Sequence, residues 1–98
     1  MPTYSVHMKH SVESCPVYND DTKKKFRELS SKREEVALEY QINVITAVFS
    51  QLEHLIIYIV EAPNHKAVER FLRGIGYAFY NKIEIREVES IEDALKTL

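Results

Sequence analysis

Residues 43–62, with the sequence NVITAVFSQLEHLIIYIVEA, decide the fold of this chain. Two runs rich in β-branched and aromatic residues, Asn43–Ser50 and Leu55–Ala62, flank the link Gln51–His54. Such runs favour strands, and a link of this length is typical of an antiparallel hairpin. Both faces of the predicted hairpin are apolar. In the first strand, alternation places Val44, Thr46 and Val48 on one face and Ile45, Ala47 and Phe49 on the other. In the second strand, Ile57 and Ile59 are on one face and Ile56, Tyr58 and Val60 are on the other.

The residues before the hairpin predict a strand and then a helix. Tyr4–His10 alternates with a period of two, which indicates a strand. Residues 11–21 contain Pro16, Asn19 and two aspartates, and they predict a loop that ends at a helix N-cap. From Thr22 the apolar positions recur at steps of three and four residues, which predicts an amphipathic helix over Thr22–Gln41.

The residues after the hairpin predict a second helix, a fourth strand and a short final helix. Pro63 ends the strand, Asn64 caps the second helix, and one of two glycines ends it. Lys82–Glu89 is the predicted fourth strand. Ser90–Asp93 resembles a capping box that opens a helix through Leu98. The spacing predicts that the buried face of the second helix consists of Val68, Phe71, Leu72 and Ile75.

The order β-α-β-β-α-β is that of the ferredoxin-like α+β fold, with a four-stranded antiparallel sheet and both helices on one face. A length of 98 residues and a mass of 11.5 kDa fit a single domain over residues 1–98. The second apolar face of the hairpin would then be exposed in one chain alone. We therefore expect a homodimer in which two copies pack sheet to sheet.

Composition and charge exclude several classes of protein. The chain is 45% hydrophobic with only two glycines and three prolines, which is typical of a folded protein. Its single cysteine excludes an internal disulfide framework. A net charge of -2 argues against binding nucleic acid by electrostatic attraction. With no signal peptide and no apolar run of roughly 20 residues, we expect a cytoplasmic protein without a membrane partner.

Three short motifs give the chain a resemblance to a known family. They are His10–Pro16 (HSVESCP), Glu53–His54 before the third strand, and Ile59–Pro63 (IVEAP). With the order of elements, they resemble the small dimeric α/β-barrel proteins of unknown function. The Val60–Pro63 segment is also similar to ferredoxin-like nickel-binding proteins. The resemblance implies a dimeric α/β barrel, an architecture that hosts binding proteins as well as monooxygenases and isomerases, so the fold alone does not choose a function.

His10, Cys15 and His54 are the candidate metal ligands. The first and third strands of this fold are antiparallel, so the end of one, at His10, should lie beside the start of the other, at His54. Imidazole and thiolate suit nickel, zinc or copper, and Glu13 or Glu53 would add a carboxylate. The alternative is a hydrogen-bonded loop over one end of the sheet, in which Cys15 is a small buried hydrophobe.

An enzyme is the second hypothesis, with His7 as its catalytic residue. His7 shares a strand face with Ser5 and Lys9 and would look into the space between the sheet and its partner. Beside Tyr58 and Arg86 as ligand-binding side chains, it would serve as general acid or base for a small substrate. The alternative is a buried histidine with a satisfied hydrogen bond.

Two further features have alternative interpretations. Glu61 is either a ligand-binding carboxylate or the partner of a basic side chain such as Arg70 or Lys66. Arg73–Tyr80 resembles the RNP1 motif of RNA-binding domains, but it follows the second helix instead of forming the third strand. We therefore expect an aromatic loop there and no nucleic-acid partner.

The sequence favours a homodimer that binds a small molecule or a transition metal. The first alternative is a cofactor-free monooxygenase-like or isomerase-like enzyme that uses His7. The second is an assembly module whose shared sheet is its whole purpose.

Overall fold

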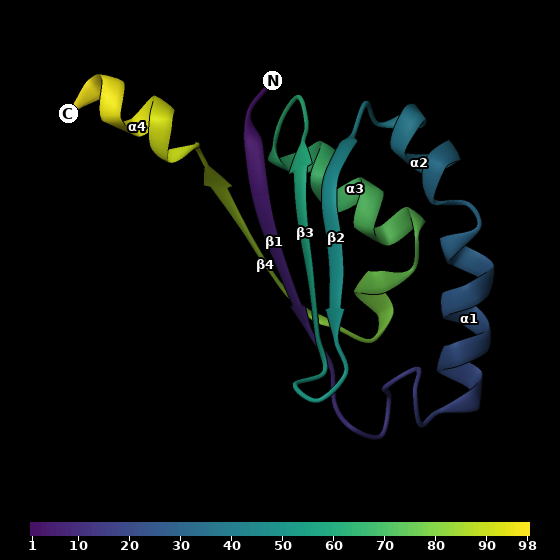
Figure 1. The fold of residues 1–98 in the computed structure, drawn as a ribbon. Helices are drawn as coiled ribbons and strands as arrows, with labels where there is room; N and C mark the ends of the chain where they lie inside the picture. Colours follow the sequence, from purple (N-terminus) through teal and green to yellow (C-terminus); the bar gives the residue numbers. More distant parts are fainter.

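The computed structural model describes residues 1–98 and contains the predicted order of strands and helices (Figure 1). The four strands are β1 (Thr3–Lys9), β2 (Asn43–Ser50), β3 (Leu55–Glu61) and β4 (Lys82–Val88). The helical elements are α1 (Asp20–Ser30), α2 (Arg33–Glu39), α3 (His65–Gly74), the 3₁₀ turn η1 (Tyr77–Phe79) and α4 (Ile91–Thr97). None of the helices is both long and apolar enough to cross a membrane.

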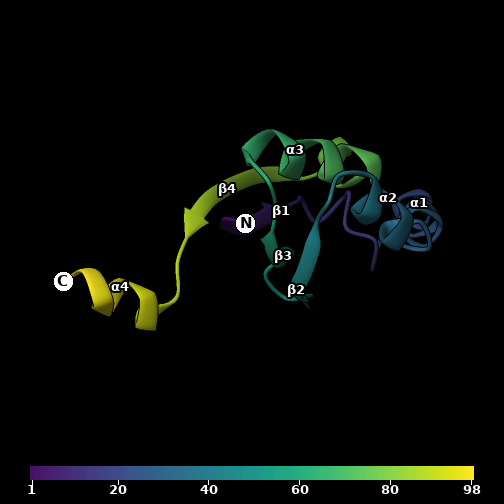
Figure 2. The same cartoon turned by 90° about the horizontal axis from the view of Figure 1, so that it is seen from above.

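The strands form one antiparallel sheet in the order β2-β3-β1-β4. This order confirms the predicted ferredoxin-like α+β fold. Helices α1, α2 and α3 lie on one side of the sheet, as the view from above shows (Figure 2). The opposite side, which we call the helix-free face, has no helix of the same chain packed on it.

The hydrophobic core lies between the sheet and these three helices. Alternate residues of β1 and β3 point into it, and the predicted buried face of α3 meets them, which confirms that prediction. Each fully buried large side chain contributes roughly 1.5–3 kcal/mol to folding. The largest contributors are Val6, Met8, Tyr58, Val60, Val68, Phe71, Leu72 and Ile75.

The predicted helix over Thr22–Gln41 is in fact two helices, α1 and α2. The chain leaves the helical path at Ser31 and Lys32. The Ser31 hydroxyl donates a hydrogen bond to the carbonyl of Glu28, and serine side chains that bond to nearby backbone compete with the helix. The apolar spacing continues across the break, so periodicity alone could not detect it.

A β-bulge at Ile45 changes the predicted faces of β2. Val44 pairs with Val60, on the core side, whereas Thr46 pairs with Ile59, on the helix-free face. One extra residue reverses the alternation of side chains along a strand. The expectation that Val44 shares a face with Thr46 and Val48 is therefore wrong.

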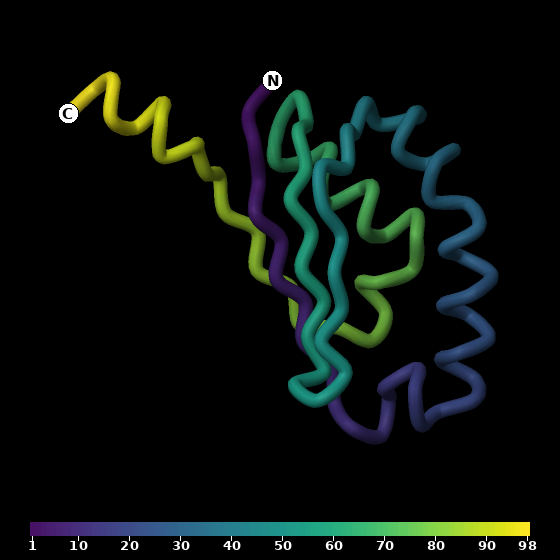
Figure 3. The backbone as a smooth tube through the Cα atoms, in the orientation of Figure 1, coloured from purple at the N-terminus to yellow at the C-terminus, as the bar shows by residue number.

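Helix α4 stands apart from the body of the protein (Figures 1 and 3). Its N-cap agrees with the prediction, because the Ser90 hydroxyl oxygen accepts a hydrogen bond of 3.1 Å from the backbone N–H of Asp93. No residue of α4 is buried. The extended C-terminal segment helps to give the molecule its elongated dimensions of 47 × 29 × 17 Å.

Candidate metal centre

The structure brings His10, Cys15 and His54 together at one end of the sheet. Their ligand atoms all lie within 4.8 Å of one another. His10 and Cys15 are buried, and His54 is half-buried. The backbone N–H of His10 donates a 3.2 Å hydrogen bond to the carbonyl of His54, so the antiparallel register of β1 and β3 sets this proximity.

The loop before α1 fixes the position of Cys15. The backbone carbonyl of Cys15 accepts hydrogen bonds from the N–H groups of Tyr18, at 3.0 Å, and Asn19, at 2.8 Å. The Asn19 side chain in turn caps α1 by accepting a 3.0 Å hydrogen bond from the N–H of Thr22. The thiol therefore sits in a turn anchored to the start of a helix, which limits its freedom before any ion binds.

Asn81 determines which nitrogen of His10 is available as a ligand. The Asn81 amide nitrogen donates to the carbonyl of Tyr77 at 3.0 Å, so its oxygen faces the imidazole. That oxygen lies 2.9 Å from His10 Nδ1, which therefore donates and carries the proton. His10 Nε2 is left with a free lone pair, buried and without a hydrogen-bond partner. Metal-binding histidines are typically held in this way by their second nitrogen.

His54 adopts a backbone conformation unusual for its residue type. Its φ of 54° lies in the left-handed region, which costs a residue other than glycine about 1–3 kcal/mol. Its Nδ1 atom is buried and has no hydrogen-bond partner. Both the strained backbone and the unpaired nitrogen occur at the residue that faces His10 and Cys15.

Aromatic side chains surround the two histidines. The ring of His10 lies 5.5 Å from that of Tyr80 and 5.9 Å from that of Phe49, while Tyr18 lies 6.2 Å from His54. Burial raises the pKa of Tyr80 to about 12, and the nearby Cys15 adds to the rise. The Tyr80 hydroxyl is buried without a hydrogen-bond partner. The cluster therefore lies in a poorly solvated environment, where a hydrogen bond or a metal–ligand bond stabilises a polar group more than it would in water.

No carboxylate belongs to this cluster of ligand atoms. Glu13 and Glu53, which the sequence suggested as additional ligands, are both exposed. Asn81 and Tyr80 were not predicted as part of the site, since they follow η1 and reach it only through the tertiary fold. The three predicted ligands would leave at least one coordination position of a bound ion free for water or a small molecule.

The structure does not bring the other predicted site residues together. His7 and Arg86 lie on the helix-free face, where His7 Nε2 is 3.0 Å from the Ser5 hydroxyl and Arg86 pairs with Glu84 at 3.1 Å. Tyr58 points to the core instead, because it lies opposite Val6 in the sheet. A pocket shared by His7, Tyr58 and Arg86 is therefore incompatible with the alternation of side chains along β1 and β3.

Glu61 lies on the helix-free face, at the end of β3. It accepts a 2.7 Å hydrogen bond from the side-chain amide of Asn43, its cross-strand neighbour. The basic partners proposed from the sequence, Arg70 and Lys66, are not the residues that bond to it. A directly opposed strand residue is a closer partner than side chains of α3.

Tyr58 belongs to a buried polar network in the core. Its hydroxyl lies 2.9 Å from that of Tyr77 and accepts a 3.4 Å hydrogen bond from Arg33. This hydrogen bond raises the pKa of Arg33, and burial raises the pKa of Tyr77 well above its usual value.

Tyr77 also stacks on Phe26, with ring centroids 5.7 Å apart. The RNP1-like segment Arg73–Tyr80 thus contains the end of α3 and the turn η1, whose Tyr77 packs on α1, in place of the strand that RNP1 requires.

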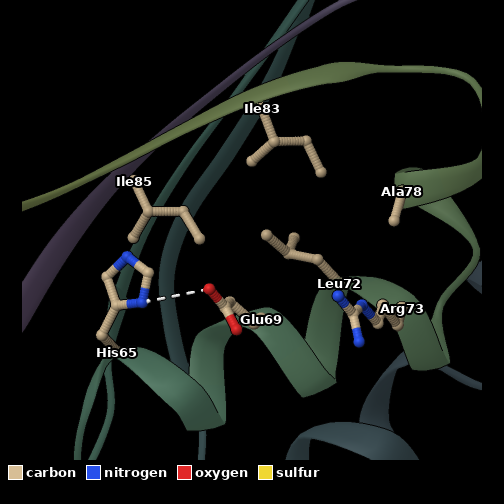
Figure 4. A pocket seen from close by; sticks show the side chains of 7 residues that line it. All are labelled: His65, Glu69, Leu72, Arg73, Ala78, Ile83 and Ile85. Carbon is tan, nitrogen blue, oxygen red and sulfur yellow. Dashed lines mark ion pairs between the residues drawn. The ribbon is translucent and has the colours of Figure 1, made fainter.

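A separate cavity of about 250 Å³ lies between α3 and β4 (Figure 4). Its polar groups include His65 and Glu69, whose Nδ1 and Oε1 atoms are 3.4 Å apart. The His65 side chain is 54% exposed, so this pair contributes little to stability. None of the predicted site residues lines this cavity.

Solved structures with a similar fold provide the available comparison. No protein-family model matches the sequence, and no curated protein matches it significantly. The protein SCO4226 of Streptomyces coelicolor A3(2) superposes with a TM-score of 0.60 and 16% identity, over 89% of this chain and 96% of that one. The chain has a ferredoxin-like fold. At this identity the similarity shows the fold alone.

Two more solved structures are similar to this chain. A REP-associated tyrosine transposase bound to a REP hairpin superposes with a TM-score of 0.57 and 6% identity; the match covers 98% of this chain but only 61% of the transposase. A dimeric ferredoxin-like protein from an uncultured marine organism aligns over 93% of this chain and 95% of its own, at 14% identity, with a TM-score of 0.39 that is too low to support an argument. The relation to nickel-binding proteins stays a prediction.

Proposed function

We propose that this protein binds one transition-metal ion per chain through His10, Cys15 and His54. The observation that carries the proposal is the convergence of a thiol and two imidazoles within 4.8 Å, two of whose nitrogens are buried without partners. Each unsatisfied buried polar group costs about 1–3 kcal/mol. A metal ion would provide a partner for both nitrogens at once.

The ligand chemistry favours nickel, zinc or copper over harder cations. Two imidazoles and a thiolate are borderline or soft ligands, whereas Mg²⁺ and Ca²⁺ require oxygen ligands that this cluster lacks. Ligands at roughly 2.0–2.3 Å from one tetrahedral ion lie roughly 3.3–3.8 Å apart. Modest side-chain rotations would therefore suffice to bring the present arrangement to coordination distance.

The proposal is tested on protein without an affinity tag, by titration with Ni²⁺, Zn²⁺ and Cu²⁺ and by native mass spectrometry. We expect one ion per chain, and loss of binding in Cys15→Ser and His54→Ala. His65→Ala is the matched control, because that histidine is exposed and lies outside the cluster. The proposal is wrong if the protein takes up none of these metals, or if the His65 variant loses as much binding as the His54 variant.

We also propose that the protein is a homodimer that pairs through its helix-free faces. Ile45 and Val48 are exposed on β2, beside the half-buried Ile57 and Ile59 of β3. A second copy of the same face is the simplest apolar cover. Native mass spectrometry of the untagged protein reports dimer mass and bound metal together. A dimer that binds no metal would favour the assembly-module alternative over a metal-binding function.

A further inference from the structure

Helix α4 presents an apolar face that nothing in the chain covers. Ile91, Leu95 and Leu98 are 72%, 62% and 96% exposed, and with Ala94 they follow the spacing of one helix face. The radius of gyration of 14.2 Å exceeds the roughly 13 Å of a compact chain of this length. Helices much shorter than about 12 residues are unstable in water without tertiary contacts. This seven-residue helix therefore requires a surface to pack on.

The helix-free face carries two lysines in direct opposition. Lys9 of β1 and Lys82 of β4 are cross-strand partners, and both are exposed. Like charges in directly opposed positions destabilise a sheet. Neither lysine has an acidic partner in the chain within ion-pair distance. The pair would be stabilised by an acidic group that approaches from outside the protomer.

The segment that contains α4 is acidic. We call residues 89–98 the arm; it carries Glu89, Glu92 and Asp93 against the single basic residue Lys96, which pairs with Asp93 at 3.5 Å and leaves the arm with a net negative charge. The negative charge of the arm is opposite to that of Lys9 and Lys82, and the apolar face of α4 matches the exposed isoleucines of the helix-free face.

An arm cannot place its acids over the lysine pair of its own sheet. Lys82 and Val88 are the two ends of β4, which a strand separates by roughly 20 Å. From Val88, an extended link to Ile91 and the first turn of α4 carry Asp93 roughly 13 Å at most. The arm also leaves the sheet pointing away from it (Figures 1 and 2). The acids of the arm therefore fall short of these lysines.

We propose that the arm of each protomer docks on the helix-free face of a second copy. This inference rests on the proposed homodimer and adds its geometry. The apolar face of α4 packs on the exposed isoleucine and valine side chains of the partner, and Glu92 and Asp93 lie near the partner's Lys9 and Lys82. The exchange is reciprocal, because a two-fold axis gives both copies the same contact.

This arrangement fixes how the two sheets are oriented. The end of β4 at Val88 in one protomer lies over the end at Lys82 in the other. A groove of about 840 Å³ between the root of the arm and the helix-free face is lined in part by Ile45, Ile59 and Val88. In this orientation it receives the end of β4 that carries the partner's Lys82.

Substitutions in the arm test the apolar contact. We expect Leu95→Asp to raise the dissociation constant of the dimer about tenfold or more, measured by sedimentation equilibrium. Because no residue of α4 is buried in the protomer, the far-ultraviolet spectrum and metal binding should stay unchanged. Leu52→Asp is the matched control, since Leu52 is an almost fully exposed leucine in the β2–β3 turn. The dimer of this variant should have the wild-type dissociation constant.

Charge reversal tests the orientation. Lys9→Glu with Lys82→Glu should weaken the dimer, and Glu92→Lys with Asp93→Lys in the same chain should restore it. Restoration supports the proposal, and its absence overturns the placement of the acids. A wild-type dimer that Leu95→Asp leaves intact overturns arm exchange but not the homodimer. A wild-type monomer overturns both, whereas the metal-binding proposal is decided separately by the titration of His54 and Cys15 variants.

Discussion

His54 holds a backbone conformation better suited to glycine, with a φ of 54°. We expect His54→Gly to abolish metal binding while it keeps or raises the free energy of unfolding of the metal-free protein by up to about 1 kcal/mol. His54→Ala should also lose the metal but be less stable than the glycine variant, because its Cβ retains the strain. Urea unfolding in the presence of a chelator, together with metal titration, measures both effects. A glycine variant less stable than the alanine variant would contradict this interpretation.

Asn81 acts on the site through His10, whose Nδ1 lies 2.9 Å from its side-chain oxygen. Asn81→Ala removes the acceptor that keeps the proton on Nδ1 and Nε2 free. Loss of such an outer partner typically lowers metal affinity by about 10–100-fold. Competition titration against a chromophoric chelator should show this decrease while one ion per chain still binds. Asn43→Ala, which removes an amide partner of Glu61 far from the cluster, should leave the affinity unchanged.

Tyr80 makes stability sensitive to alkaline pH. Burial raises its pKa to about 12, whereas an unfolded tyrosine titrates near pH 10. The folded state keeps this proton where the unfolded state loses it, so the contribution is complete below about pH 10 and is lost as the pH rises toward about 12. Tyr80→Phe should therefore flatten the fall of the free energy of unfolding over this interval. Tyr18→Phe, at an exposed tyrosine, should retain the wild-type slope.

At the scale of elements, two glycines determine how closely α1 and α2 approach: Gly74, the last residue of α3, and Gly76, just beyond it. Gly76 has a φ of 80°, and a Cβ there would collide with Leu29 of α1. A Cβ at Gly74 would lie 2.6 Å from a methyl group of Val36 in α2, but its φ is not positive. We expect Gly76→Ala to lower the free energy of unfolding by about 1–3 kcal/mol. Gly74→Ala should cost less, because it gains up to about 1 kcal/mol of helix propensity. Urea unfolding of the two variants provides the comparison, and equal losses would contradict it.

Local patterns predicted most of these elements but not their interruptions. The period-two alternation of β1 and the helical spacing of α3 are each determined by side chains of that element, so the sequence predicts them directly. The break at Ser31 accompanies a hydrogen bond from its hydroxyl to the carbonyl of Glu28, and the bulge inserts the single residue Ile45. Neither change alters the pattern of apolar residues in the surrounding sequence. The antiparallel register predicts that His10 meets His54. It cannot predict Asn81 or Tyr80, which reach the cluster through the path of the chain after α3.

At the scale of the whole molecule, the three candidate metal ligands come from parts of the chain that are distant in sequence. His10 ends β1, Cys15 lies in the loop before α1, and His54 precedes β3. An ion held by all three would bind the folded state and have no comparable site in the unfolded chain. Metal binding should therefore stabilise the entire fold and not only its loops.

This coupling predicts the size of the stabilisation. With free metal at 100 times the dissociation constant, the free energy of unfolding should rise by about 2.7 kcal/mol. Cys15→Ser removes the thiolate and should show no such rise, whereas His7→Ala, on the helix-free face, should show all of it. Thermal or urea unfolding at fixed protein concentration measures the difference, since dimer dissociation would otherwise add to it. If Cys15→Ser gained as much stability as the wild type, the ion would be binding elsewhere on the chain.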